Sequence, residues 1–298
     1  MNANHPVRRK VRSAGQACDR RQVLEPRAPG RGALLCLAAV AVAVAIGAGL
    51  LLARPWIAAV LSAEAVSPAP LAAAKPSTEK TEDRRYAEAR KTMIEDDLRA
   101  RDITDAKVLE IMGRIPRHRF VPEHLLGLAY ADRPLPIGHD QTISQPYIVA
   151  LMTQAVRPGP ESRALDIGTG SGYQAAVLAE MCKEVYSIEI LKPLAESATK
   201  RLADMGYKNV TVRAGDGYRG WPDKAPFDVI IVAAAPDHVP QPLVDQLAKG
   251  GKLVIPVGQF FQELLIIEKQ KDGTVRRKSI APVRFVPMRG EAEKTREK

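Results

Sequence analysis

The sequence predicts a doubly wound α/β fold with an antiparallel edge, and three observations lead to this class. From residue 164 onward, short apolar runs typical of buried strands alternate with helical patterns, which is typical of a parallel sheet. A glycine-rich loop at residues 168–172 follows the first of these runs and precedes a helical pattern. The last two strand-like runs follow each other with no helical pattern between them, which predicts the antiparallel edge.

Four segments follow one another along the 298-residue chain: a basic leader (1–31), a hydrophobic segment (32–61), a linker rich in Pro and Ala (62–82) and a folded domain (83–298). The leader holds eight basic and two acidic residues, so it carries +6 of the net charge of +10. Because little positive charge is left for the folded domain, we expect no nucleic-acid partner. Two of the three cysteines precede the folded domain and no Cys/His cluster has zinc spacing, so we expect neither a disulfide framework nor a metal.

The hydrophobic segment contains 21 consecutive uncharged residues, 33–53, enough for a helix that spans a bilayer core of about 30 Å. The basic flank before it would keep the N-terminus in the cytosol and place the folded domain outside, anchored to the inner membrane or exported. Cleavage as a signal peptide near residues 61–65 is a second interpretation. A start codon downstream of the segment is a third, and it leaves the protein in the cytoplasm.

Helical spacing of apolar residues predicts a helix from about 84 to 115, which Pro116 ends. A short helix is expected at 123–130 and a loop or irregular strand at 131–144. The next helix is expected to begin at Gln145, because Pro146 suits the first helical turn.

The remaining domain shows the alternation described above. Strands are predicted at 164–167, 185–189, 210–212, 227–232, 252–255, 264–267 and 279–286. Helices are predicted between the earlier strands at 172–182, 192–205 and 239–249.

Acidic residues mark the ends of three successive predicted strands: Asp166, Glu189 and Asp216. Ligands of such folds bind outside the carboxyl ends of the strands, so these acids are expected to lie along one binding edge. Glu189 is placed to accept hydrogen bonds from two ribose hydroxyls, and Asp216 from an adenine amino group.

The glycine loop indicates which nucleotide binds there. Its third glycine comes one position earlier than in the dinucleotide motif, and the loop has no basic residue to hold a pyrophosphate. S-adenosylmethionine is a nucleoside cofactor without a phosphate, so we expect this cofactor. The residues expected to bind it are Asp166, Gly168, Thr169, Gly170, Gly172, Glu189, Asp216 and Gly217.

The fourth strand of the parallel set is followed by Ala233-Ala234-Ala235-Pro236. This sequence lacks the Asn/Asp-Pro-Pro-aromatic motif with which amino methyltransferases of bases hold a nitrogen, so another acceptor is favoured. A carboxylate is already ionised at neutral pH and needs positioning and partial desolvation, but no general base.

Residues 136–147, Pro-Ile-Gly-His-Asp-Gln-Thr-Ile-Ser-Gln-Pro-Tyr, add a specific signature. Together with 120–122, 165–173, 215–217 and 285–287, they resemble the protein-L-isoaspartate O-methyltransferase family. The resemblance runs from about Met93 to Met288. It implies a class I, Rossmann-like methyltransferase fold, S-adenosylmethionine as cofactor, and isoaspartyl residues of damaged proteins and peptides as substrate. It also implies a cytoplasmic protein, and we expect a monomer.

The resemblance also implies that Ser144 is the catalytic residue and that Thr142 and Ile143 position the substrate. A hydroxyl just before a helix can donate to a carboxylate oxygen while backbone N–H groups hold the other oxygen. The structural alternative is that Ser144 merely caps the helix that follows. The histidines of the folded domain are expected to be structural or on the surface.

Two other functions fit the same cofactor site. A membrane-tethered module could bind a nucleoside without catalysis, since the hydrophobic segment would separate the domain from cytosolic cofactor. Alternatively, the enzyme could methylate carboxylates of small molecules.

Overall fold

The computed structural model describes residues 78–296, with side chains described from Asp83 to Lys294. The predicted leader, the hydrophobic segment 32–61 and nearly all of the linker lie outside the described residues. In the portion from residue 78 to residue 296, no helix is both long and apolar enough to cross a membrane.

A seven-stranded sheet forms the centre of residues 78–296, in the strand order β5-β4-β3-β6-β7-β8-β9. The strands are β3 (Arg163–Ile167), β4 (Glu184–Glu189), β5 (Val210–Ala214), β6 (Phe227–Val232), β7 (Leu247–Val257), β8 (Gln262–Lys269) and β9 (Val275–Val283). The first five strands in the spatial order are parallel, and β8 and β9 pair antiparallel with their neighbours. The predicted doubly wound α/β class with an antiparallel edge is therefore confirmed.

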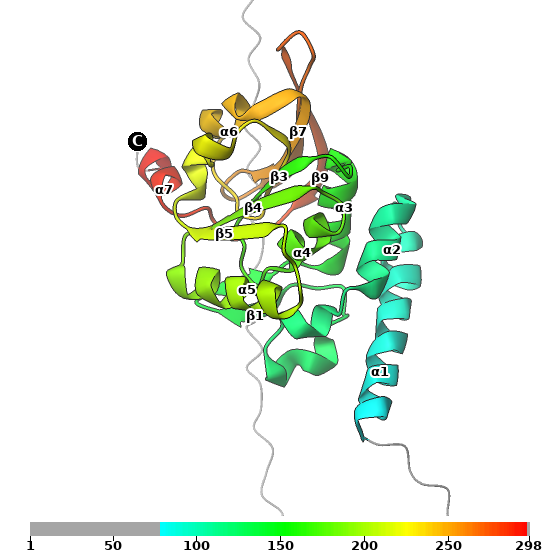
Figure 1. Cartoon of the computed structure of the whole chain (residues 1–298). Helices are drawn as coiled ribbons and strands as arrows, with labels where there is room; N and C mark the ends of the chain where they lie inside the picture. Colours follow the sequence, from blue (N-terminus) through cyan, green and yellow to red (C-terminus); the bar gives the residue numbers. More distant parts are fainter. Residues whose placement is uncertain (1–77, 297–298) are drawn as a thin grey trace, which may run out of the picture. The chain divides into compact units, whose positions relative to one another are not determined.

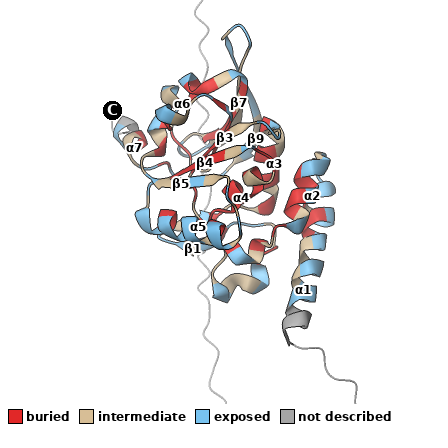
Figure 2. Ribbon diagram, in the orientation of Figure 1, coloured by how far each residue is buried: buried red, intermediate tan, exposed pale blue. Residues whose placement is uncertain are grey.

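Helices cover both faces of the sheet (Figure 1). One face packs against α3 (Pro146–Val156), α4 (Tyr173–Ala179) and α5 (Lys192–Asp204), and the other packs against α6 (Gln241–Asp245) and α7 (Glu291–Arg296). Because side chains alternate along a strand, Ala164 of β3 joins the first cluster and Leu165 joins the second. Burial on both faces explains why the predicted strands are apolar almost throughout (Figure 2).

The segment before the sheet differs from the single helix predicted at 84–115. It contains α1 (Thr78–Thr92), a π-helical stretch η1 (Met93–Arg99) that continues it, and a separate α2 (Ala106–Arg114). The Asp105 side chain accepts the backbone N–H groups of Lys107 and Val108 and so begins a new helix. The Gln154 side chain of α3 accepts the N–H groups of Thr104 and Asp105, which holds the break in place.

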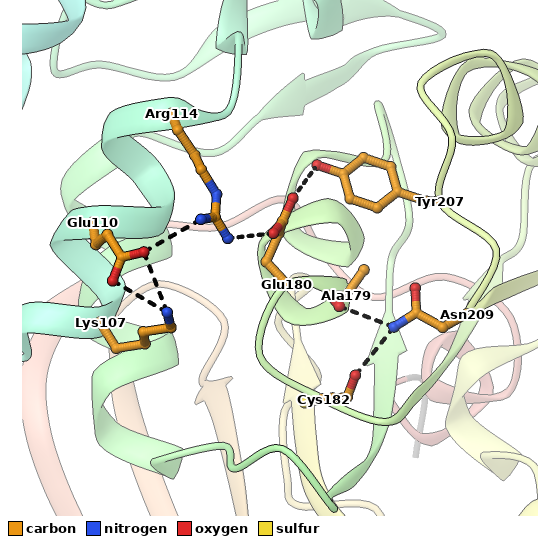
Figure 3. Close-up of polar contacts among 8 residues, drawn as sticks. All are labelled: Lys107, Glu110, Arg114, Ala179, Glu180, Cys182, Tyr207 and Asn209. Atoms are coloured by element: carbon orange, nitrogen blue, oxygen red, sulfur yellow. Dashed lines mark hydrogen bonds and ion pairs between the residues drawn. The ribbon is translucent and has the colours of Figure 1, made fainter.

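Polar contacts join α2 to the helices on the sheet (Figure 3). Arg114 of α2 pairs with Glu180 at the end of α4, and Glu180 also accepts the Tyr207 hydroxyl at 3.3 Å. The Asn209 side chain donates to the carbonyls of Ala179 and Cys182 at 2.9 and 3.1 Å. These contacts close the end of α4 that lies away from the glycine loop.

Residues 131–144, predicted as a loop or irregular strand, form a hairpin of β1 (Leu135–Gly138) and β2 (Gln141–Ile143). Its two turn residues, His139 and Asp140, both have positive φ (54° and 58°), as a type I′ turn requires. Helix α3 follows at Pro146, as predicted.

Several other elements also differ from the prediction. The helix predicted at 239–249 is shorter, because residues from Leu247 join β7. The last strand spans Val275–Val283 and not 279–286, since its pairing with β8 begins at Val275. The predicted helix at 123–130 is a 3₁₀ helix, η3 (Glu123–Leu128), and the short α7 was not predicted.

Candidate functional site

A pocket opens at the carboxyl edge of the sheet, beside the neighbouring strands β3 and β6. From this pair the order of the strands along the chain continues in opposite directions, which makes it the switch point of the sheet. It encloses about 880 Å³ between protein atoms, its open mouth included. Five segments supply most of its walls: residues 141–144 of the hairpin, 167–171 after β3, 188–190 after β4, 233–234 after β6 and 286–289 near the C-terminus. We call it the glycine-loop pocket.

The glycine loop forms the floor of this pocket with an unusual backbone. Gly168, Gly170 and Gly172 have φ values of 91°, 52° and 91°, a region that side chains with a Cβ rarely adopt. Gly168 and Gly170 line the pocket together with Thr169. Gly172 precedes α4 as its N-cap and faces Leu202 of α5, and its φ of 91° is the reason that glycine suits this position.

Asp166 lies beneath the loop and is fully buried. The Ser187 hydroxyl donates to its Oδ2 at 2.6 Å, and the Thr169 and Ser187 hydroxyls are 2.5 Å apart. Burial raises the pKa of Asp166 to about 7, although the Ser187 hydrogen bond opposes the shift. The carboxyl group therefore supports the loop through two hydroxyls and does not line the pocket.

Glu189 lies in the pocket wall at the end of β4. Its carboxylate accepts the backbone N–H of Gly170 at 2.8 Å and of Leu191 at 3.0 Å. These bonds fix the carboxylate against the glycine loop. A carboxylate has about four acceptor positions, so Glu189 can also accept from a ligand hydroxyl.

Asp216 and Gly217 follow β5. Gly217 lines the pocket, and a Cβ at this position would come within 2.3 Å of Ile167 Cγ2, so only glycine allows this close approach to β3. The Asp216 carboxylate lies outside the pocket wall and accepts the N–H groups of Tyr218 and Glu291 at 2.9 and 2.8 Å. Asp216 thus joins two segments that each contribute to the wall.

Thr142, Ile143 and Ser144 lie at the end of the hairpin, and all three line the pocket. The Ser144 hydroxyl makes no hydrogen bond to another described residue. The N-cap position of α3 belongs to Gln145, which makes no side-chain capping bond. The capping alternative for Ser144 therefore has no support in the structure.

Thr142 and Ser144 also line a second cavity, which we call the outer groove. Its other walls come from Arg101, from Tyr147 and Ile148 of α3, and from residues 281–286. The Arg101 guanidinium lies 3.3 Å from the centre of the Tyr147 ring. Because Thr142, Ser144, Ala233 and Val286 belong to both cavities, these four residues form the wall between the glycine-loop pocket and the outer groove.

A buried arginine, which the sequence analysis missed, supports this wall. Arg117 is fully buried and donates to the carbonyls of Ala129 (2.8 Å) and Ser144 (2.7 Å). Its guanidinium lies 4.7 Å from the centre of the Tyr173 ring, and burial lowers its pKa. Arg117 belongs to an Arg-His-Arg-Phe stretch that reads as an exposed basic turn, so the sequence held no signal for this contact.

The C-terminal wall was also missed. Val286, Pro287, Met288 and Arg289 line the pocket. A bridge between Ala235 and Pro287 and a hydrogen bond from Met288 N to the Ala235 carbonyl hold this segment. Its presence could have been anticipated only from the 285–287 part of the family signature, because the segment follows the last strand. Over the described residues there is also no group of three or more His, Cys, Asp or Glu that could hold a metal ion.

Comparisons with known proteins agree with this arrangement. Residues 88–293 match the sequence model of the family described as protein-L-isoaspartate(D-aspartate) O-methyltransferase. The protein-L-isoaspartate O-methyltransferase 2 of Syntrophobacter fumaroxidans is 53% identical over 216 residues, covering 69% of this chain and 87% of that protein. The protein-L-isoaspartate O-methyltransferase of a Synechococcus species is 57% identical over 211 residues, covering 68% and 86%.

Solved structures give the same family. A protein-L-isoaspartate O-methyltransferase superposes with a TM-score of 0.64 at 28% identity, covering 70% of this chain and 69% of that one. A structure of the Plasmodium falciparum protein, described as a complex with S-adenosyl-L-homocysteine, has a TM-score of 0.59 at 28% identity and covers 67% and 98%. The chain belongs to the protein-L-isoaspartate O-methyltransferase family.

Proposed function

We propose that the protein transfers a methyl group from S-adenosylmethionine to the α-carboxyl group of L-isoaspartyl residues in damaged proteins and peptides. The observation that carries this proposal is the position of Ser144. Its free hydroxyl lies in the wall between the glycine-loop pocket and the outer groove, so it can contact an acceptor in the groove. The resulting methyl ester closes spontaneously to a succinimide and releases methanol. Hydrolysis of the succinimide then gives the normal aspartyl linkage in a fraction of the molecules.

The glycine-loop pocket fits the cofactor. It has glycines where a ligand must approach the backbone, a carboxylate at Glu189 for ribose hydroxyls, and no phosphate-binding lysine in the loop. Gly168, Thr169, Gly170, Glu189 and Gly217 would contact the nucleoside, while Asp166, Gly172 and Asp216 support the walls. When bound, S-adenosylmethionine supplies an electrophilic methyl group.

The acceptor needs orientation and not activation, because a carboxylate is ionised at neutral pH. Ser144 would donate a hydrogen bond to one oxygen of the acceptor carboxylate, and the other oxygen would then face the pocket. Thr142 and Ile143 would position the acceptor by shaping the wall beside Ser144. No His–carboxylate relay contacts the Ser144 hydroxyl among the residues described, so a nucleophilic role of the serine-hydrolase type finds no support. The outer groove is open, as a polypeptide acceptor requires.

We further propose a cytoplasmic, monomeric enzyme without a nucleic-acid partner, because the cofactor and the isoaspartyl substrate are both available there. An inner-membrane anchored or exported form, based on residues 33–53, is the alternative that the apolar run in the sequence favours. Sequencing the N-terminus of the protein from each cell fraction distinguishes the two. A chain that starts downstream of residue 53 in the cytoplasmic fraction would support the first, whereas a chain that keeps residues 33–53 in the membrane fraction, or one cleaved near residues 61–65 and exported, would support the second.

The substrate assay uses the full chain with three acceptors: an isoaspartyl peptide, the same peptide with a normal aspartyl residue, and a free small dicarboxylic acid. We expect S-adenosylhomocysteine and methanol to form with the isoaspartyl peptide alone. Equal turnover of the free acid would favour the small-molecule methyltransferase. Cofactor binding without turnover of any acceptor would favour the nucleoside-binding module.

A further inference from the structure

Two adjacent phenylalanines form an exposed apolar pair in a loop that hydrogen bonds connect to the wall of the outer groove. Phe260 and Phe261 are each 94% exposed, far more than any other large apolar side chain among the described residues. They lie in the loop that joins β7 to β8, between Val257 and Gln262. Single exposed apolar residues are common, but a neighbouring pair of aromatic rings in water is a typical mark of an interaction surface.

The backbone of this loop is anchored at Gly258, whereas its two exposed rings have no packing partner. Gly258 has a φ of 130° and donates its N–H to the Pro236 carbonyl at 2.9 Å. A Cβ at Gly258 would come within 2.0 Å of the Phe261 carbonyl oxygen, so the tight turn requires glycine. The loop therefore presents both rings to solvent beside an anchored turn.

The loop is joined directly to the wall of the outer groove. The Gln262 side chain donates to the Phe285 carbonyl at 3.1 Å and accepts the Phe285 N–H at 2.6 Å. Phe285 and Val286 line the groove, and Val286 shares the wall with Ser144. In addition, β7 is parallel to β6, so its loop leaves the sheet at the same carboxyl edge as the pocket.

We propose that Phe260 and Phe261 bind apolar side chains of the substrate polypeptide beside the isoaspartyl residue, and so favour damaged sites in unfolded apolar segments. This inference rests on the proposed function, because it takes the outer groove as the acceptor site. The continuity of the loop with the groove wall favours a substrate chain over a lipid surface or a second copy of the protein. Aromatic side chains supply large contact area at a small cost in conformational entropy, which suits contact with many different sequences.

The test compares the wild-type full chain with the double variant Phe260→Ser/Phe261→Ser. Two isoaspartyl peptides of equal length are used, one with Leu and Phe at two to four positions on both sides of the isoaspartyl residue, the other with Ser at those positions. We expect KM for the apolar peptide to rise about tenfold in the variant with kcat unchanged, and KM for the Ser peptide to stay the same. Leu128→Ser, which removes a partly exposed apolar side chain from η3, is the matched control.

A second measurement separates this inference from the proposed function. Binding of a fluorescent apolar peptide with a normal aspartyl residue is followed by anisotropy, and we expect the double variant to bind it about tenfold more weakly than wild type. If no isoaspartyl peptide is methylated, the proposed function fails while this binding measurement still decides the role of the two rings. Unchanged KM and unchanged binding would overturn the inference.

Two further outcomes would also overturn it. Loss of binding to phosphatidylcholine–phosphatidylglycerol vesicles, with KM ratios unchanged, would assign the rings to a lipid surface. A change from dimer to monomer in sedimentation velocity, again with KM ratios unchanged, would assign them to self-association. Because both rings are exposed, the double variant is expected to keep the wild-type thermal unfolding midpoint.

Discussion

The Asp216 carboxylate accepts the backbone N–H of Glu291 at 2.8 Å, across 75 residues of sequence. Its other oxygen accepts the N–H of Tyr218. Gly290 makes the approach possible, because a Cβ there would lie 2.6 Å from Asp216 Oδ2. One carboxylate therefore joins the turn that contains Gly217 to the C-terminal segment, and both line the glycine-loop pocket.

Removing this carboxylate is expected to weaken cofactor binding. In Asp216→Ala the two wall segments lose their shared acceptor, so we expect Kd for S-adenosylmethionine to rise about tenfold or more by titration calorimetry. Asp223→Ala, which changes an exposed carboxylate in the neighbouring turn, is the control and should bind as wild type does. Equal affinities for the two variants would contradict the assignment.

Removing the Ser144 hydroxyl should lower turnover without affecting the cofactor. We expect Ser144→Ala to lose roughly a hundredfold in kcat on an isoaspartyl peptide, the usual cost of one positioned donor, while Kd for S-adenosylmethionine stays the same. Ser279→Ala removes an exposed hydroxyl from β9 and serves as the control. Wild-type turnover in Ser144→Ala would exclude this hydroxyl from the reaction.

Arg117 is expected to act through Ser144 and not on the substrate, since it binds the Ser144 carbonyl from inside the protein. Arg117→Ala removes the donor from the buried Ala129 carbonyl and the partly buried Ser144 carbonyl, so the free energy of unfolding should fall by about 2–4 kcal/mol in urea titrations. Arg117→Lys keeps a cation but loses the forked geometry. We expect kcat to fall and KM to change little in this variant, whereas a purely structural role would leave kcat of the folded fraction unchanged.

Asp166 is expected to make stability depend on pH. Its pKa is about 7 in the folded protein and near 3.8 in the unfolded chain, so the unfolded state loses this proton first as pH rises. The contribution of Asp166 therefore disfavours folding progressively between about pH 4 and pH 7 and is constant above that range.

The variant Asp166→Asn removes this penalty while keeping an acceptor for Ser187. We expect it to be more stable than wild type at pH 8 by on the order of 4 kcal/mol, and equally stable near pH 4. Urea titrations at the two pH values measure the difference, with Asp223→Asn as the control. A gain of equal size at both pH values would show that ionisation of Asp166 is not the cause.

Sequence alone determined the order of strands and helices from residue 164 onward, because each buried strand needs a continuous apolar run and each crossover helix an apolar stripe. It also determined the glycine loop, since backbone with positive φ there requires glycine, and the family signature around Ser144. It could not give the break at residues 100–105, because that break depends on Gln154, about fifty residues away.

Only the tertiary structure decided which of the predicted residues reach the pocket. Asp166, Glu189 and Asp216 look alike in the sequence, each an acid at a strand end. Folding buries the first beneath the loop, places the second in the wall and gives the third to the C-terminal segment. Successive side chains of a strand point to opposite faces of the sheet, and the groups that bind each carboxylate come from segments distant in sequence. The role of each acid is therefore fixed by what packs around it.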